Sequence, residues 1–532
     1  MAEIIVKPHN RRVALHVGRT LLSYIQELGV DIDASCGGRG VCGRCLVKAA
    51  PSESLTPPNE VERRLVKPGF RLACQARIIR DDRNLQVEVP TFVGYKILEM
   101  GIVKPIPLNP PVVRRSTPKG EKVYWRGVEV DDYRGEIYGL AVDVGTTTLA
   151  MYWVNLETGV VEHISSMLNP QIRYGDNVID RINYARIGRQ ADLEKAVRGG
   201  VNQMILQKPI NPDHIYEVAV VGNTVMRDIF IGHPVSQMGE SPFEPISTSP
   251  ENISAGDLGL RVNRTANVYA LPLIGHFVGA DALAVILAVE MHLSRDVVMA
   301  IDIGTNTEIA VGCEDGIVVT SCASGPAFEG SGVKCGTGAV AGAIQSVEIG
   351  RDLKIRYETI GGAAPTGICG SGLIDLLAQM LERGIIDWRG RFTSGRDRLT
   401  IVGGDKEIFI DGEDIDNLKL AKSAINVGAR ALMRHYGVKV RDISRLYLAG
   451  AFGNYIDPRN AVRIGILPNM PLRKIVKVGN AAIEGAREVL LSQEKRVEAE
   501  KIPGKTRHIR LEVEENFHDM FIQGLSFGRY RS

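Results

Sequence analysis

Four cysteines near the N-terminus have the residue type and the spacing to bind a metal cluster. Cys36, Cys42 and Cys45 follow a C-x5-C-x2-C pattern, and Cys74 supplies a fourth thiol. The glycines between the first three let a backbone wrap closely around an inorganic core. The pattern predicts a 2Fe-2S cluster, which moves one electron at a time. A zinc site stays open as the alternative, although structural zinc usually takes two close cysteine pairs and only Cys42 and Cys45 form one.

The elements expected around these cysteines are those of a small ferredoxin. Residues 3–18 alternate apolar and polar side chains around a polar turn, residues 20–29 have the pattern of a short helix, and residues 85–90 that of a closing strand. This order resembles a β-grasp ferredoxin, and the first cysteine gap is one residue longer than in the plant-type pattern. The resemblance favours the cluster over zinc.

The remaining cysteines show no ligand spacing. They are scattered through the second half of the chain without a C-x2-C pair, and a reducing compartment disfavours disulfides. We expect them to be small buried apolar side chains, with a second cluster as the alternative. They are Cys313, Cys322, Cys335 and Cys369.

Charge and hydropathy narrow the range of partners. The chain has 532 residues, of which 64 are basic and 62 acidic, so there is no electrostatic reason to expect nucleic-acid or anionic membrane binding. The first ten residues lack the apolar core of a secretory signal, and no apolar run approaches the ~18 residues that span a bilayer. We therefore expect a cytoplasmic protein whose partners are proteins or small molecules, with no nucleic acid and no membrane.

A pattern that occurs twice downstream could bind phosphate. The sequence A-x-D-x-G-T-x-T has its aspartate at Asp143 and again at Asp302, 159 residues later. In each copy a buried strand ends near the aspartate, turns at a glycine and returns as a second apolar strand. Turn amides of this kind bind phosphate oxygens, and a carboxylate at the strand end can hold hydrated Mg²⁺. The copies predict a duplicated fold with these phosphate-binding residues: Gly145, Thr146, Thr147, Thr148, Gly304, Thr305, Asn306 and Thr307.

The paired hairpins resemble the two phosphate loops of the superfamily that contains acetate and sugar kinases, Hsp70 and actin. Residues 445–457 form a third element, a strand that runs into a glycine-rich turn and looks like the adenosine loop of that superfamily. The resemblance implies an ATPase in which this turn and the helix start at 478–486 contact the nucleoside. An ordinary strand–turn–helix is the alternative for each element taken alone. The residues implied are Gly450, Ala451, Phe452, Gly453 and Asn480.

Proline content suggests how the chain is divided. Five prolines lie between residues 104 and 118 in a segment without helical periodicity. Such a composition is stiff and extended, so we expect a hinge that lets the redox module swing across an α/β body. The expected units are a ferredoxin-like domain at 1–90, a linker at 91–135, a first actin-like ATPase lobe at 136–298 and a second at 299–532.

A C-x5-C-x2-C ferredoxin joined to two D-x-G-T hairpins is a rare pairing, and it resembles the reductive activators of corrinoid proteins. These ATP-dependent enzymes serve methyl transfer in anaerobic bacteria and archaea. The resemblance covers nearly the whole chain, through segments that start at residues 169, 220, 271, 323, 367, 448 and 517. Some activators in methanogens carry C-terminal 4Fe-4S motifs and no N-terminal ferredoxin. Activators with an N-terminal 2Fe-2S domain are the closer match.

The resemblance implies ATP-dependent transfer of one electron to a Co(II) corrinoid protein, which regenerates Co(I). The implied cofactors are a 2Fe-2S cluster, ATP and Mg²⁺, and the implied partners are the corrinoid protein, an upstream electron donor and a second copy in a homodimer. Asp143 and Asp302 would organise Mg²⁺, and Asp281 is a candidate for orienting the attacking water. Two alternatives stay open: an electron donor to a different enzyme, and a redox-sensing module that switches partner affinity without electron transfer.

Overall fold

The N-terminal module of the computed structural model is a five-stranded mixed sheet. The structure describes residues 2–7, 10–28, 30, 32, 45–66, 69–89, 104–404, 407–450, 453 and 455–528. The sheet order is β2-β1-β5-β3-β4, with β1 and β5 parallel. This arrangement confirms the expected ferredoxin order of hairpin, helix and closing strand. The elements are β1 (Glu3–Lys7), β2 (Arg11–Ala14), α1 (Leu21–Glu27), β3 (Leu46–Ala50), α2 (Glu60–Leu65), β4 (Arg71–Leu72) and β5 (Leu85–Glu88).

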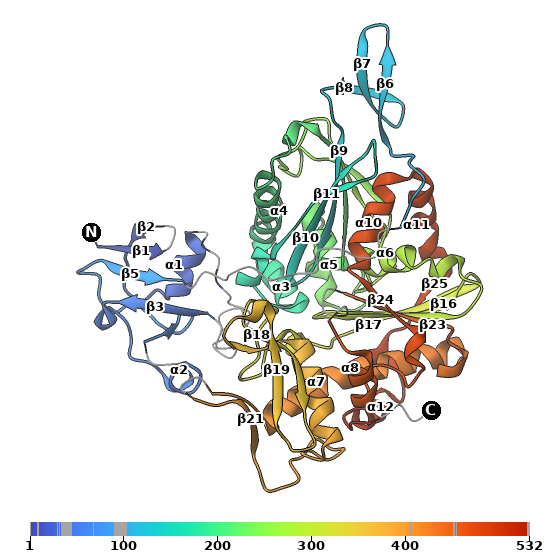
Figure 1. Cartoon of the computed structure of the whole chain (residues 1–532). Coiled ribbons are helices and arrows are strands. Elements are labelled where there is room, and N and C mark those ends of the chain that lie inside the picture. Colours follow the sequence, from blue (N-terminus) through green and yellow to red (C-terminus); the bar gives the residue numbers. More distant parts are fainter. Residues whose placement is uncertain are drawn as a thin grey trace.

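The proline-rich segment differs from the expected hinge. Residues 112–132 form a three-stranded antiparallel sheet of β6 (Val112–Thr117), β7 (Gly120–Trp125) and β8 (Val128–Asp132), which projects from one end of the body (Figure 1). Before β6, the chain contacts the end of the helix α10 (Ala481–Leu491), because the Asn109 amide donates to Leu491 O at 2.8 Å. The strand pairings are local, but the contact of Asn109 with Leu491 joins residues far apart in the sequence, which composition does not show. Residues 90–103 lie outside the described part.

Two six-stranded sheets build the body, and they repeat one topology. Their orders are β11-β10-β9-β12-β14-β13 and β24-β23-β15-β16-β17-β25. In each, a three-stranded antiparallel meander continues into two parallel strands, so the duplication predicted from the repeated pattern is present. The first sheet holds β9 (Tyr138–Val144), β10 (Thr148–Asn155), β11 (Val161–Leu168), β12 (Ile215–Gly222), β13 (Glu251–Ser254) and β14 (Asn267–Ala270). The second holds β15 (Val298–Ile303), β16 (Thr307–Cys313), β17 (Gly316–Cys322), β23 (Arg445–Ala449), β24 (Ile475–Gly479) and β25 (Thr506–His508).

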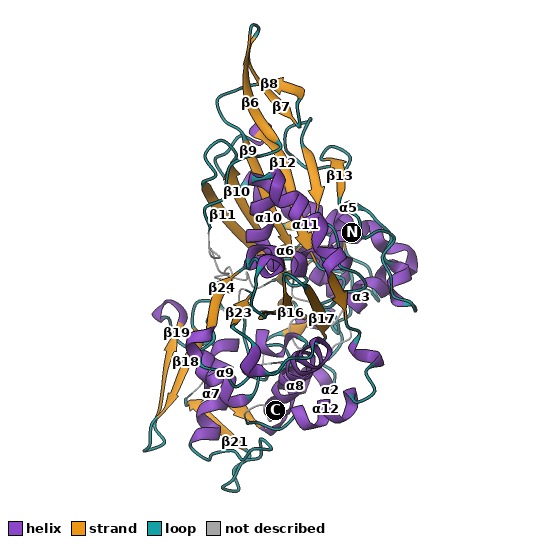
Figure 2. Cartoon of the chain, turned by 90° about the vertical axis from the view of Figure 1, so that its right-hand side faces the viewer, coloured by secondary structure: helices purple, strands orange, loops and turns teal. Residues whose placement is uncertain are grey.

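Helices cover the outer faces of both sheets and fill the space between them (Figure 1, Figure 2). The outer face of the first sheet packs on α3 (Val178–Tyr184), α4 (Gln190–Leu206) and α5 (Thr224–Ile231). The outer face of the second packs on α7 (Gly370–Glu382), α8 (Gly412–Tyr436), α9 (Pro458–Ile464) and α12 (Phe517–Gly524). The central layer contains α6 (Ala280–Ala288), α10 (Ala481–Leu491) and α11 (Gln493–Lys505).

The central layer crosses the expected lobe boundary. α10 and α11 follow β24 of the second sheet, yet their apolar residues pack in one core with strands of both sheets. α10 crosses α6 at Gly485, where a Cβ atom would lie 2.4 Å from Ala284 O. The first lobe is therefore completed by chain from the second half of the sequence. None of the helices in the described ranges is long and apolar enough to cross a membrane.

Two smaller sheets complete the second half of the body. One contains β18 (Ala343–Ile349), β19 (Ile355–Thr359) and β20 (Gly367–Ile368), and the other is the hairpin of β21 (Arg398–Val402) and β22 (Ile408–Asp411). The N-terminal module reaches the first lobe through Gln26, whose Nε2 donates to Arg173 O at 2.5 Å.

Candidate nucleotide site and cluster module

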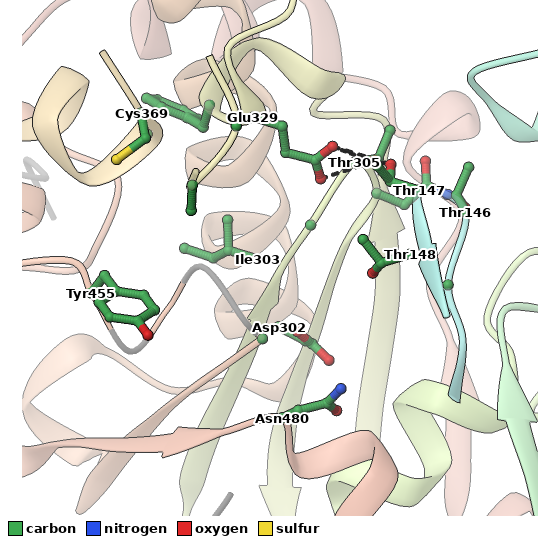
Figure 3. Close-up of a pocket in the computed structure, with 18 of the residues that line it drawn as sticks. Thr146, Thr147, Thr148, Asp302, Ile303, Thr305, Glu329, Cys369, Tyr455 and Asn480 are labelled. Atoms are coloured by element: carbon green, nitrogen blue, oxygen red, sulfur yellow. Dashed lines mark hydrogen bonds between the residues drawn. The ribbon is translucent and has the colours of Figure 1, made fainter. Parts of the chain in front are cut away.

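The tips of the two predicted hairpins face one cavity of about 330 Å³ between the sheets (Figure 3). This volume falls in the range of small-molecule sites. Most residues predicted from the repeated pattern and the adenosine-like turn line it. They are Asp143, Gly145, Thr146, Thr147, Thr148, Asp281, Asp302, Gly304, Thr305, Asn306, Gly450 and Asn480.

The four other residues predicted for this site have different outcomes. Thr307 does not line the cavity: it is buried at the start of β16, and its hydroxyl bonds that of Ser324 at 2.9 Å. Strand alternation turns it away from Asn306. Gly453 is also absent from the lining, since its Cα faces the end of β23, where a Cβ would lie 2.3 Å from Ala449 O. Ala451 and Phe452 lie outside the described residues.

Glycine is required where the hairpins and the third element meet. At Gly145 a Cβ atom would lie 2.7 Å from Thr148 O, so any side chain there would open the first turn. Gly450 has φ +91°, and a Cβ would lie 2.6 Å from Asp302 Oδ1. A left-handed backbone with no room for a side chain fits glycine alone. The adenosine-like turn therefore packs directly on the aspartate of the second hairpin.

Carboxylates gather at the floor of the cavity. Burial raises the pKa of Asp143 to about 6, and the Asn480 amide, which donates to its Oδ2 at 2.8 Å, opposes that shift. Burial and the charge of Asp143 raise the pKa of Asp302 to about 7. Burial together with both of these aspartates raises the pKa of Asp281 to about 8. Glu308 also lines the cavity, and burial raises its pKa well above the usual value.

This charge distribution fits a hydrated cation bound together with phosphate. The lining residues include no lysine or arginine among the described side chains, so a bare polyphosphate would meet only negative charge. Within those residues, no three His, Cys, Asp or Glu side chains form a group that holds a metal by itself. Mg²⁺ usually keeps several waters and binds through one or two carboxylates plus substrate phosphates. Asp143 and Asp302 both line the cavity and could supply these one or two carboxylate ligands.

Glu329 is a cavity residue that sequence reasoning missed. Thr305 Oγ1 lies 2.9 and 3.0 Å from its two carboxylate oxygens, and Thr147 Oγ1 lies 3.1 Å from Oε2 (Figure 3). The two hydroxyls, one from each hairpin, are 2.8 Å apart. Glu329 opens a glycine-rich stretch that matches no phosphate motif, so no local signal identified it.

A buried polar network supports the first hairpin from behind. Asn169 Nδ2 donates to Gly145 O at 2.8 Å, and Arg181 donates to Thr146 O. Arg181 also donates to Gln171 Oε1 at 3.0 Å. Asn169, Gln171 and Arg181 are fully buried. These groups bind the carbonyls of the turn, whose residues line the cavity on the other side.

Half of the predicted cluster ligands lie in the described part of the chain. Cys45 and Cys74 are buried, and their sulfurs are 3.3 Å apart. Two converging thiols, one just before β3 and one in the turn after β4, fit a sulfur-ligated cluster, and Gln75 Nε2 lies 3.4 Å from Cys74 Sγ as a neighbouring donor. Cys36 and Cys42 lie outside the described residues. Their share of the ligand set stays a prediction.

The four remaining cysteines differ in their burial. Cys313, Cys322 and Cys369 are buried as expected, whereas Cys335 is partly exposed. No cluster of metal-binding side chains includes them in the part of the chain that the structure describes. Burial raises the pKa of Cys322, which disfavours a thiolate ligand there.

Comparison with known proteins agrees with this arrangement. Residues 4–78 match the 2Fe-2S iron-sulfur cluster binding domain, residues 138–294 match the RACo middle region, and residues 296–531 match the C-terminal domain of RACo, the ASKHA domain. ASKHA denotes the acetate and sugar kinase, Hsp70 and actin superfamily, so the resemblance seen in the hairpins is confirmed. The chain belongs to the RACo family of reductive activators of corrinoid proteins.

Individual relatives extend over most of the chain. A protein from Eubacterium limosum named corrinoid activation enzyme RamQ is 31% identical, over 94% of this chain and 95% of its own. A protein from Methanosarcina barkeri named [Co(II) methylated amine-specific corrinoid protein] reductase is 26% identical, over 74% of this chain and 77% of its own. A solved structure titled reductive activator for corrinoid,iron-sulfur protein superposes with a TM-score of 0.73 at 28% identity, over 99% of this chain and 98% of its own.

Proposed function

We propose that this protein is an ATP-dependent reductive activator, which passes one electron to the Co(II) form of a corrinoid protein and so regenerates Co(I). The observation that carries the proposal is the joining, in one chain, of a 2Fe-2S-type module to a two-hairpin cavity suited to a nucleotide. The end-to-end match to proteins named for corrinoid activation supports the acceptor.

The physical need for a nucleotide follows from the direction of electron flow. Reduction of Co(II) to Co(I) requires an electron at a potential lower than most donors provide. A gap of ~100 mV costs ~2.3 kcal/mol per electron. ATP binding or hydrolysis offsets such a cost if it changes how tightly the activator holds its partner.

Each group of cavity residues has its own role in the proposed function. The hydroxyls and turn amides of the two hairpins bind the phosphates, and Asp143 and Asp302 hold a hydrated Mg²⁺ that neutralises them. Asp281 stands at the start of α6 and orients the attacking water. Gly450 and Asn480 contact the nucleoside side of the cavity. The 2Fe-2S cluster, held by Cys36, Cys42, Cys45 and Cys74, supplies single electrons.

Two further partners belong to the proposal. An upstream reductant reloads the N-terminal module after each transfer, because the chain passes on one electron at a time. A second copy completes a homodimer, as in the family that the chain resembles.

The test is a single-turnover assay with pre-reduced protein, a purified Co(II) corrinoid partner and ATP. We expect Co(I) to appear with ATP and to be strongly reduced without it. Asp302→Asn should lose ATP hydrolysis and ATP-driven Co(I) formation while the visible cluster spectrum stays intact. Equal Co(I) formation with and without ATP would favour a different role for the nucleotide site, and no Co(I) under either condition would favour the redox-sensing module.

A further inference from the structure

The Glu329 carboxylate joins the two lobes at the tips of their phosphate hairpins. It comes from the second lobe, as does Thr305, whereas Thr147 belongs to the first. Each threonine hydroxyl has a single proton to donate. Both hydroxyls lie against the same carboxylate, at 2.9 to 3.1 Å. The two hydroxyl oxygens are also 2.8 Å apart, and either can donate to the other, so the pair engages Glu329 either with both protons or with one proton passed between the threonines.

The backbone holds Glu329 in this place. It is the last residue of a short 3-10 turn, Pro326–Glu329, between Gly325 at φ +72° and Gly330 at φ +83°. A Cβ atom at Gly330 would lie 2.4 Å from Thr337 N, so only glycine permits the close approach. The neighbouring Phe328 is buried in the core of the second lobe. Glu329 thus stands on a tightly packed turn rather than on a free loop.

A phosphoryl oxygen would need the same two donors. Carboxylate and phosphate are both anions, and no lysine or arginine among the described lining residues stands between them to reduce their repulsion. Two anions cannot accept from the same hydroxyl protons in the same space. Binding of a phosphate to the two hydroxyls therefore weakens their hydrogen bonds to Glu329, and the bonds to Glu329 weaken phosphate binding.

The competing phosphate is the one farthest from the nucleoside. Tyr455 and Gly450 both line the cavity, and Figure 3 shows Thr147 and Thr305 on the side away from Tyr455. A nucleotide with its base near Tyr455 directs the end of its phosphate chain toward the two hydroxyls. ATP is one phosphate longer than ADP, so its terminal phosphate reaches the hydroxyls of Thr147 and Thr305 where the shorter chain of ADP ends before them.

We propose that Glu329 competes with the terminal phosphate of ATP for the hydroxyls of Thr147 and Thr305. This inference rests on the proposed nucleotide site. When the terminal phosphate takes these donors, Glu329 is released from the first-lobe hairpin. The contact between the lobes then depends on whether the nucleotide carries a third phosphate, which makes Glu329 a specificity-determining residue.

The test measures nucleotide affinity of the full-length protein directly, by calorimetry at fixed free Mg²⁺. The ligands are ADP and the β,γ-imido analogue of ATP, and the variant is Glu329→Gln, which keeps the shape of the side chain and removes its charge. We expect Glu329→Gln to bind the ATP analogue at least about fivefold more tightly, with ADP affinity changed by less than about twofold. Glu348→Gln, a change at an exposed carboxylate on β18, is the matched control and should alter neither affinity.

Several results would overturn the inference. Equal affinities in wild type and variant would show that Glu329 does not compete, and equal gains for both nucleotides would show a general charge effect. Slower hydrolysis with unchanged affinities would place Glu329 among the groups that act on the attacking water. If wild type bound neither nucleotide, the proposed function itself would fail, which separates that outcome from a failure of this inference.

Discussion

The Asn480 side chain links the second lobe to the first phosphate hairpin, and replacing it gives a sharp test of how the lobes support each other. Asn480 is the residue before α10, and its side-chain oxygen accepts from Ile483 N at 3.1 Å. Its Nδ2 donates to Asp143 Oδ2 at 2.8 Å. One side chain therefore caps a central helix and bonds a buried carboxylate from the other lobe.

The expected cost of each change follows from these two bonds. Loss of a helix cap costs about 1 kcal/mol, and loss of a hydrogen bond to a charged group costs about 1.5–3 kcal/mol. Asn480→Ala loses both bonds, so it should destabilise the body by about 2.5–4 kcal/mol. Asn480→Ser keeps a capping oxygen but loses the amide that reaches Asp143. Its expected cost is about 1.5–3 kcal/mol.

Urea unfolding followed by circular dichroism measures the order of stability. We expect the midpoint to fall from wild type to Asn480→Ser and further to Asn480→Ala. The control is Asn516→Ala, because Asn516 also precedes a helix but makes no side-chain capping bond. Its midpoint should match that of wild type.

Two outcomes would refute this reasoning. If Asn480→Ser unfolded at the same urea concentration as wild type, the bond to Asp143 would contribute nothing to stability. If Asn480→Ala and Asn480→Ser were equally unstable, the cap on α10 would contribute nothing, and the helix would depend on packing alone.

Three more predictions concern the cluster, the metal and a buried amine. Cys45→Ser should lose the visible absorption of the cluster while its nucleotide affinity stays unchanged. The control Cys335→Ser, in the body, should keep both the absorption and the affinity. An unaltered spectrum in Cys45→Ser would remove this thiol from the ligand set. Chelation of Mg²⁺ should lower ATP affinity at least about tenfold and added Mg²⁺ should restore it; metal-independent affinity would contradict the role given to the acidic floor. Burial lowers the pKa of Lys422 to about 7 from its usual 10.5, so the unfolded chain binds more protons between these values and stability should rise with pH from about 7 toward 10. The slope should be weaker in Lys422→Met but kept in Lys354→Met, a change at an exposed lysine, as measured by urea midpoints at several pH values.

Local patterns predicted most of the residues that line the cavity between the hairpins. A buried strand, an aspartate, a glycine turn and hydroxyl residues fix a hairpin within eight positions, and the hairpin recurs in the second half of the chain. Two copies of one local structure in a duplicated fold bring their tips together. The same holds for the ferredoxin-like module, whose short-range alternation and helix signal match its strands and α1.

Other features depend on chain that is far away in sequence. The proline-rich segment looked extended because composition does not show that Asn109 pairs with Leu491 or that Trp125 Nε1 donates to Glu217 Oε2 at 2.9 Å. The lobe boundary missed α10 and α11, because a helix pattern shows an apolar face but not which sheet it covers.

The sequence by itself determined the types of chemistry, because thiols, carboxylates and glycine turns stand at fixed local spacings. Only the tertiary structure decided which other side chains contact the residues of the two hairpins. Glu329 is brought to Thr147 across 182 residues and Arg181 to Thr146 across 35. Each contact depends on layers of packed helices and sheets rather than on a motif. For that reason, the support of the first hairpin and the competitor for its hydroxyls became visible only in the folded chain.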